Sequence, residues 1–310
     1  MGMHPRWIKE GSVYSLTQRT VDRQFLFRPD PVVENIIGAS AARALKKHPV
    51  NLHWLDVNIN HETMGLSPID GSAQGLTNVA RFKQMYHRLL AEELNRYLGR
   101  EGGIFSSRSR DIECLDHQSA VDKMFYSMTN PVKDGLVDRT AHWEGFSSYQ
   151  ALACGKSPVY TYIDRTAWHK AGGVRSKKPL GAFTKTIRLE FTSLPGWAHL
   201  TADQQAAQAR RECRILEQLY REERQRNGRS VMGKAKMEKL DHRDRPKSKP
   251  VRTRKPLCHA ASKEAARAYI ESFKDFLKAY REASCSYRSG CSDVLFPSGS
   301  FKPPLIEAVA

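Results

Sequence analysis

The sequence lacks three features that would each point to a particular class of protein. No run of apolar residues approaches the roughly 18 that a membrane-spanning helix needs, so we expect no transmembrane segment. The first residues contain no apolar stretch of the kind found in secretory signals. None of the six cysteines forms a Cys-x-x-Cys pair, and their spacings match no standard zinc site. We therefore expect reduced thiols and a cytoplasmic protein.

Acidic residues are scarce relative to basic ones. The 310 residues include 50 Lys and Arg against 33 Asp and Glu, which gives a formal net charge of +17. Such an excess attracts polyanions, so it favours nucleic acid or another anionic surface as partner. Hydrophobic residues make up 40% of the chain, enough for a sizeable core, and the length permits one large domain or two.

The apolar pattern of the first half predicts a mixed succession of strands and helices. Alternation predicts strands over 13–21, 50–57, 61–66 and 104–114, and spacings of three and four predict helices over 30–48, 76–98 and 117–130. This order predicts an α+β protein of the ferredoxin-like type, in which an antiparallel sheet carries helices on one face.

The composition changes after residue 155, which predicts a second region. Expected features are helices over 201–226 and 262–283, a strand over 184–194 and a Lys-, Arg- and Pro-rich extended arm over 233–257. We therefore divide the chain into a domain at 10–155 and a basic, mainly helical C-terminal extension at 156–310.

A polar stripe marks the helix predicted after Asp116. Asp122, Tyr126 and Asn130 lie four residues apart and share a face, just before Pro131. A tyrosine in such a place more often packs its ring and leaves its hydroxyl in water. With an unperturbed pKa near ~10, the hydroxyl is also a weak nucleophile until its proton is removed. The helix alone therefore favours a structural role for Tyr126.

Four segments carry a more specific pattern. They are YSLTQRTVDRQFLF (14–27), INHETMGL (59–66), ARFKQMYHRLLAEELNRYLGREGGIF (80–105) and FYSMTNPVKDGLVDRTAHWEGFSSYQAL (125–152). Together they resemble the single-tyrosine HUH transposases of the IS200-like type, in the branch associated with repetitive extragenic palindromes. The last segment is the most specific, because its Tyr-x-x-x-Asn-Pro-Val-x-x-Gly-Leu-Val and its Ser-Ser-Tyr are in register with the family pattern.

The resemblance implies an enzyme of DNA transposition that cleaves and rejoins single-stranded DNA beside a hairpin. In the family a tyrosine forms a 5′-phosphotyrosine, while a divalent metal ion, Mg²⁺ or Mn²⁺, polarises the phosphate. By position Tyr126 is then the catalytic nucleophile, and His61 and Asn130 are metal ligands. The resemblance also implies hairpin and single-stranded DNA as partners, no membrane, a nucleoid-associated location and, as in some members, a homodimer.

The sequence departs from the family at the His-hydrophobic-His triplet, where it has His61, Glu62 and Thr63. A threonine hydroxyl is a weak neutral ligand and does not replace an imidazole. Alternation along a strand directs Glu62 away from His61, and His53 on the neighbouring strand is another candidate for the vacant place. Two interpretations therefore stay open: an active transposase, and a catalytically impaired relative that binds DNA.

Basic residues near these motifs are the candidate DNA contacts. Arg108 and Arg110 lie two apart on one predicted strand and so share a face, and Lys123 and Lys133 flank Tyr126. Such side chains hold the phosphates of a hairpin and its single-stranded flank. An RNA-binding module on the same sheet is disfavoured, because the predicted strands lack its aromatic signature.

Overall fold

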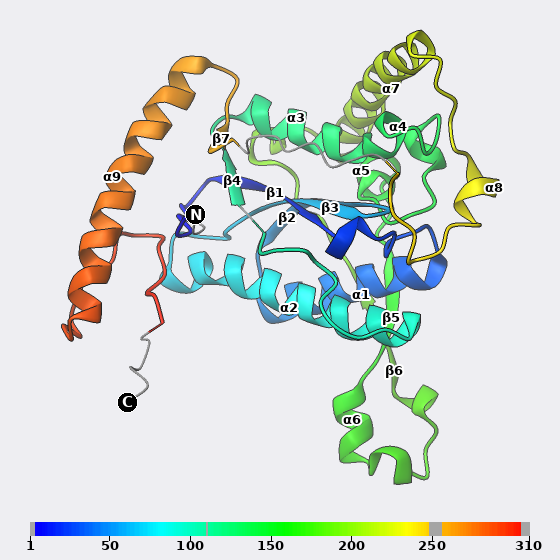
Figure 1. Cartoon of the computed structure of the whole chain (residues 1–310), viewed down its shortest axis with the longest axis horizontal. Coiled ribbons are helices and arrows are strands. Elements are labelled where there is room, and N and C mark those ends of the chain that lie inside the picture. The colour runs from blue at the N-terminus through cyan, green and yellow to red at the C-terminus, as the bar shows by residue number, and fades with distance from the viewer. Residues whose placement is uncertain (1–3, 110, 248–255, 305–310) are drawn as a thin grey trace.

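The computed structural model describes residues 4–109, 111–247 and 256–304 (Figure 1). Within these residues one sheet has five strands, in the order β2-β3-β1-β4-β7. They are β1 Val13–Arg19, β2 Asn51–Asn58, β3 His61–Ser67, β4 Asp111–Cys114 and β7 Cys258–His259. Neighbouring strands are antiparallel except β4 and β7, which are parallel. The predicted α+β class and mainly antiparallel sheet are therefore confirmed.

Two long helices cover one face of the sheet. They are α1 Pro31–Lys47 and α2 Ala73–Leu98. The Asp30 carboxylate accepts the N–H of Val32 at 2.8 Å and so caps α1, with proline in the first turn as the sequence predicts. Both helices pack their apolar sides on strand residues that point the same way, among them Tyr14, Leu16, Leu55 and Met64.

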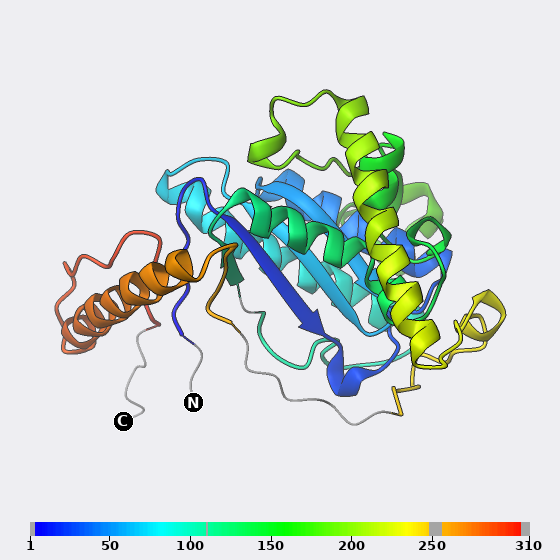
Figure 2. The ribbon, with the colours of Figure 1, turned by 90° about the horizontal axis from the view of Figure 1, so that it is seen from above.

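Three further helices cover the opposite face. They are α3 His117–Met128, α5 Tyr149–Cys154 and α7 Ala202–Arg226. Viewed from above, α3 runs along the sheet and α7 crosses near its end (Figure 2). A second core joins Val13 and Trp54 of the strands to α3 and α7. Successive strand residues point to opposite faces, and here residues of both sets are buried under helices, so the prediction of helices on one face is wrong.

The strand predicted over 104–114 is shorter than expected. β4 begins only at Asp111, and residues 104–109 form a loop along the end of β1. In this loop the backbone of Ser106 donates to Arg19 O at 3.0 Å, and Gln18 Nε2 donates to Ser107 O at 2.7 Å. The residues whose apolar and polar side chains alternate therefore hydrogen bond to the end of β1 but do not form a strand.

Beyond residue 155 the chain adds a projecting hairpin and more helices. β5 Val159–Ile163 and β6 Thr184–Arg188 pair antiparallel, and α6 Arg165–Lys170 lies in their connection. α9 Lys263–Arg288 lies beyond β7 (Figure 1). The helices predicted over 201–226 and 262–283 are therefore confirmed. The strand predicted over 184–194 ends earlier, at Arg188.

Several short helices complete the described structure. They are α4 Asn130–Lys133, α8 Lys234–Met237 and the 3-10 turns Val21–Arg23, Thr140–His142, Gly173–Arg175, Leu180–Phe183 and Pro195–Trp197. None of the helices in the described ranges is both long and apolar enough to cross a membrane.

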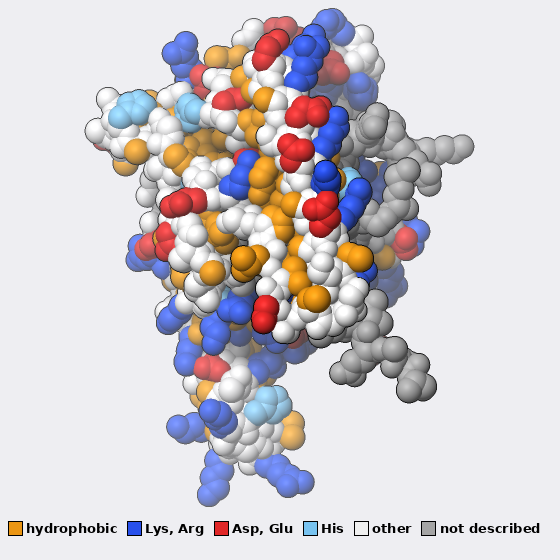
Figure 3. Space-filling view, turned by 90° about the vertical axis from the view of Figure 1, so that its left-hand side faces the viewer, with side chains coloured by type: hydrophobic (Ala, Val, Ile, Leu, Met, Phe, Trp, Pro, Cys, Tyr) orange, Lys and Arg blue, Asp and Glu red, His pale blue; other side chains and the backbone are white. Residues whose placement is uncertain are grey.

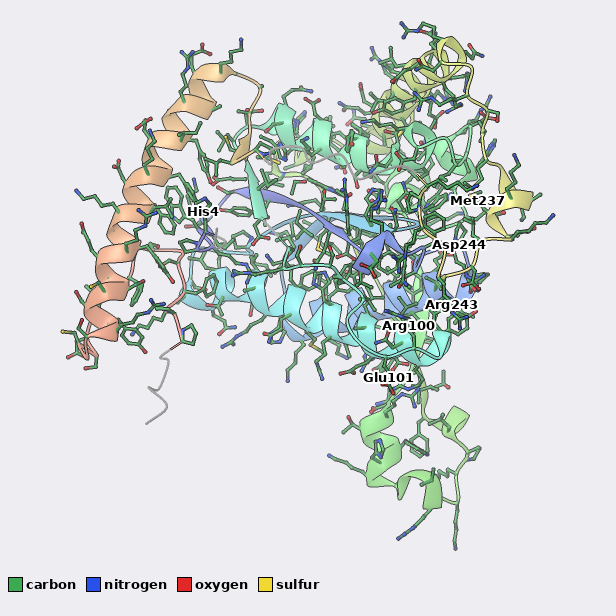
Figure 4. All side chains as sticks on the ribbon, viewed as in Figure 1. His4, Arg100, Glu101, Met237, Arg243 and Asp244 are labelled. Carbon is green, nitrogen blue, oxygen red and sulfur yellow. The ribbon has the colours of Figure 1, made fainter. Side chains whose placement is uncertain are left out.

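The arm predicted over 233–257 is described as far as residue 247 and again from 256. It begins with α8, and then the backbone oxygen of Asp244 accepts the N–H of Phe25 at 2.9 Å. Figure 4 shows Met237 and Asp244 near one end of the molecule and His4 toward the opposite end. The described part of the arm therefore packs on the body near the end of β1.

Candidate functional site

Tyr126 lies on the exposed side of α3, near the end of the helix. The helix begins at Asp116, whose carboxylate accepts the N–H of Ser119 at 2.7 Å in a capping box. Its apolar stripe, which includes Met124 and Phe125, is buried in the core between α3 and the sheet. The tyrosine ring therefore faces outward, with 37% of its surface exposed, and is accessible to a macromolecular ligand.

Two ammonium groups flank the Tyr126 ring. Lys133 Nζ, on α4, donates to Tyr126 Oη at 3.2 Å and lies 4.4 Å from the ring centre. Lys123 Nζ, on α3, lies 5.5 Å from the same centre. Partial burial lowers the pKa of Lys133, but the hydrogen bond to Tyr126 and nearby charges outweigh it and raise that pKa. Both lysines predicted to contact DNA are therefore cationic neighbours of the predicted nucleophile.

One pocket beside the end of α3 contains His61, Thr63 and Asn130. The resemblance implies that His61 and Asn130, the two proposed ligands, lie together. Residues of β2 and α3 also line this pocket, among them Asp56 and Ser127. Asn130 Nδ2 donates to His61 Nε2 at 3.0 Å. Tyr126 is not among the described residues that line the pocket. The two predicted ligands therefore line one cavity, and the predicted nucleophile lies outside its lining.

The donor groups of this pocket do not fit a divalent metal ion. His61 Nε2 accepts from Asn130, which places the ring proton on Nδ1, 3.0 Å from Asn60 Oδ1. Burial, and secondarily the charge of Arg19, lower the pKa of His61 to about 4, so the ring is neutral with both nitrogens engaged. Thr63 offers only a hydroxyl. Across the described ranges, no three His, Cys, Asp or Glu side chains lie close enough to hold a metal.

Neither Glu62 nor His53 supplies the missing ligand. Glu62 points to the α2 face, as strand alternation predicts, and its carboxylate lies 2.6 Å from His87 Nε2. His53 lies at a bulge in β2 and is hydrogen bonded to Ser67 Oγ at 3.0 Å. Both side chains are therefore engaged away from the pocket that contains His61.

Asp56 joins three segments around the pocket. Its carboxylate accepts from Ser127 Oγ at 2.7 Å, from Ser147 Oγ at 2.6 Å and from the N–H of Ser148 at 2.9 Å. Burial raises the pKa of Asp56, although these hydrogen bonds act to lower it. The carboxylate therefore holds α3 in place and is not free for a ligand. A carboxylate inside the strand predicted over 50–57 is the signal in the sequence that would have found it.

The structure does not group Arg108 with Tyr126. Arg108 lies in the loop before β4, and burial is the main factor that lowers its pKa. Its ionisable neighbours include Asp111, whose carboxylate is bonded to Lys83 of α2, and Tyr280 of α9. Arg110, the other arginine of the predicted pair, lies outside the described residues.

Similarity to known proteins is weak. No protein-family model matches the chain, and no curated protein matches it. Among solved structures, a chain described as "Structure of the REP associates tyrosine transposase bound to a REP hairpin" is similar with a TM-score of 0.40 and 16% sequence identity. The match covers 51% of this chain and 89% of that chain. A similarity of this strength assigns neither a fold nor an activity, which have to come from the residues themselves.

Proposed function

We propose that this chain binds hairpin and single-stranded DNA at the exposed Tyr126 ring, without a metal ion. The observation that carries this proposal is the pair of ammonium groups, from Lys123 and Lys133, that flank the ring. An exposed aromatic ring offers a stacking surface to a base, and the cations beside it attract the neighbouring phosphates. The net charge of +17 supports the same class of partner.

The site further supports a transposase-like protein in which metal-dependent cleavage is impaired. The hydrogen bonds of His61 with Asn60 and Asn130 engage the imidazole that the family resemblance assigns to the metal. The strand order β2-β3-β1-β4, with α1 and α2 on one face, supports a ferredoxin-like core. A homodimer and a nucleoid location stay predictions from the resemblance.

Strand cleavage is the second candidate function, because Lys133 donates to the hydroxyl of Tyr126. An ammonium group in this place offsets the negative charge that develops on a phosphodiester as the hydroxyl attacks it. In that reaction Tyr126 Oη forms a bond to phosphorus, and the bond from phosphorus to the 3′ oxygen breaks. The tyrosine proton passes to solvent, the 3′ oxygen takes up a proton, and a 5′-phosphotyrosine remains.

Fluorescence anisotropy with a DNA hairpin that carries a single-stranded flank tests the proposed binding. We expect Kd to change by less than about twofold with EDTA or in Tyr126→Phe, which keeps the ring. The variant Lys123→Ala/Lys133→Ala should bind at least ~tenfold more weakly at low salt, because two phosphates then have no cation beside them. The exposed pair Lys263→Ala/Lys278→Ala on α9 removes the same charge and should bind like the wild type.

Two outcomes contradict this proposal: loss of affinity in EDTA, and unchanged affinity in the Lys123/Lys133 variant. A denaturing gel decides the second candidate. A covalent protein–DNA adduct that forms with Mg²⁺ or Mn²⁺ in the wild type, and is absent in Tyr126→Phe, would establish cleavage and show that metal chemistry survives.

A further inference from the structure

A basic finger projects from the body on the side of α1 and α2 (Figure 1). We define the finger as residues 159–188, which contain β5, α6, two 3-10 turns and β6. Its Lys and Arg residues outnumber its acidic residues, of which Asp164 is the sole example. Figure 3 shows Lys and Arg side chains on several sides of its free end, at the bottom of the view.

The base of the finger is fixed to α1. The ring of Tyr160 occupies the space beside Gly38, where a Cβ would lie 2.3 Å from the ring. The Asn35 side chain donates to Thr161 O at 2.8 Å and accepts the N–H of Thr161 at 2.9 Å. These contacts hold the two strands against the helix, so the finger presents its free end at a defined position.

Among the residues that the structure describes, four basic side chains toward the free end have no acidic partner. Within the described residues they form no ion pair: Lys170, Arg175, Lys177 and Lys178. By contrast Lys185, nearer the base, pairs with Asp164 at 2.6 Å. Unpaired and mutually repelling cations on a narrow projection are unfavourable for an isolated chain, whereas a polyanion would neutralise all four.

The shape of the finger favours one kind of polyanion. The paired strands Val159–Ile163 and Thr184–Arg188 form the base of the finger, and the four cations lie beyond them, on α6 and the turns that follow, so they gather at one tip. Duplex DNA carries about one charge per 1.7 Å of its axis, a higher density than a single strand, and its major groove admits an α-helix. Val174, beside Arg175, is 91% exposed, and an exposed aliphatic group suits contact with the methyl groups in that groove. We propose that the finger binds double-stranded DNA through phosphate contacts from its four unpaired cations. This contact goes beyond the function proposed for Tyr126 and does not depend on it.

Affinity for a blunt DNA duplex without a hairpin tests the finger. The variant Lys170→Ala/Arg175→Ala/Lys177→Ala/Lys178→Ala should bind at least ~tenfold more weakly. The slope of log Kobs against log salt should shrink by about 0.9 for each phosphate that is no longer neutralised, or roughly 3 to 4 in total. The matched variant Lys263→Ala/Arg267→Ala/Lys278→Ala/Arg281→Ala removes four cations from α9 and should leave duplex binding within about twofold.

Three results would overturn the proposal: unchanged duplex binding in the finger variant, an equal effect in the α9 variant, and weakening restricted to single-stranded DNA. Replacing Lys170, Lys177 and Lys178 by arginine keeps the charge and should keep the affinity. Thermal unfolding checks that each variant is folded. Hairpin binding by the Lys123/Lys133 variant is measured in parallel, so failure at the finger and failure at Tyr126 give different results.

Discussion

At the scale of residues, hydrogen bonding determines the chemistry available to His61. Its ring lies between Asn60 and Asn130, and its Cα pairs across the sheet with that of Arg19. A metal ion would have to displace Asn130 and approach a site beside a guanidinium group. Desolvation and this neighbouring charge also disfavour the imidazolium form. Both effects favour a neutral histidine with a positioning role.

The neutral ring of His61 should make folding stability depend on pH. The pKa of His61 is about 4 in the fold and 6.5 for the unperturbed group, so the folded state binds the proton less readily. Stability is therefore full above about pH 6.5 and falls as the pH drops toward about 4, by at most roughly 3 kcal/mol. Urea unfolding at a series of pH values measures this slope, and His61→Gln should reduce it. An identical slope in the variant would contradict the assignment.

Some of these residue positions were predictable from the sequence. Helical and strand periods place Tyr126 away from the apolar stripe of its helix and Glu62 on the face opposite His61, as observed. The contact of Lys133 with Tyr126 was not predictable, because it depends on how α4 turns after Thr129. The sequence itself shows that Thr63 stands where the family has a second histidine. The hydrogen bond from Asn130 to His61 was not predictable, because it depends on where α3 ends over β3.

At the scale of elements, one buried carboxylate fixes the helix that carries Tyr126. Asp56 of β2 accepts hydrogen bonds from α3 and from the turn before α5, and it is only 6% exposed. Three segments distant in the sequence therefore depend on a single residue. Strand β2 lies at one edge of the sheet, and α3 and α5 share one core with its Trp54.

Removal of the Asp56 carboxylate should destabilise the protein strongly. Asp56→Ala leaves the donors of Ser127, Ser147 and Ser148 without their partner in a buried site, which should lower the free energy of unfolding by about 3–5 kcal/mol. Chemical denaturation gives this value. The exposed Asp122→Ala, on α3, is the control and should change stability by less than about 0.5 kcal/mol. Equal effects of the two substitutions would contradict the role of Asp56 in holding α3 and the turn before α5 against β2.

The periodicity of the sequence predicted most elements of the first half of the chain. It did not predict that helices cover both faces of the sheet. Helices α1, α2 and α3 begin and end within a few residues of their predicted positions. Element order alone does not say which face a helix covers, so the position of α3 opposite α1 and α2 required the tertiary structure. Residues 156–178 show no clear period, because the short strand and the turns there are mostly exposed.

At the scale of the whole molecule, the change of composition at residue 155 does not separate two cores. Leu189 belongs to the core below the sheet, with α1 and α2, and Trp197 to the core above it, with α3. The C-terminal half therefore contributes to both faces. Its finger extends from the α1 side, whereas Tyr126 lies on the α3 side (Figure 1).

This separation implies that the two proposed DNA surfaces act independently. A hairpin bound at Tyr126 and a duplex bound by the finger should occupy opposite faces of the sheet, so neither blocks the other. We expect protein that is saturated with unlabelled hairpin to bind a labelled duplex with a Kd raised by less than about threefold. This rise comes from repulsion between the two DNAs, and salt screens that repulsion. Anisotropy of the labelled duplex measures it, with unlabelled duplex as the competing control. Full displacement of the duplex by the hairpin would mean that both DNAs share one surface, and the finger would then have no separate role.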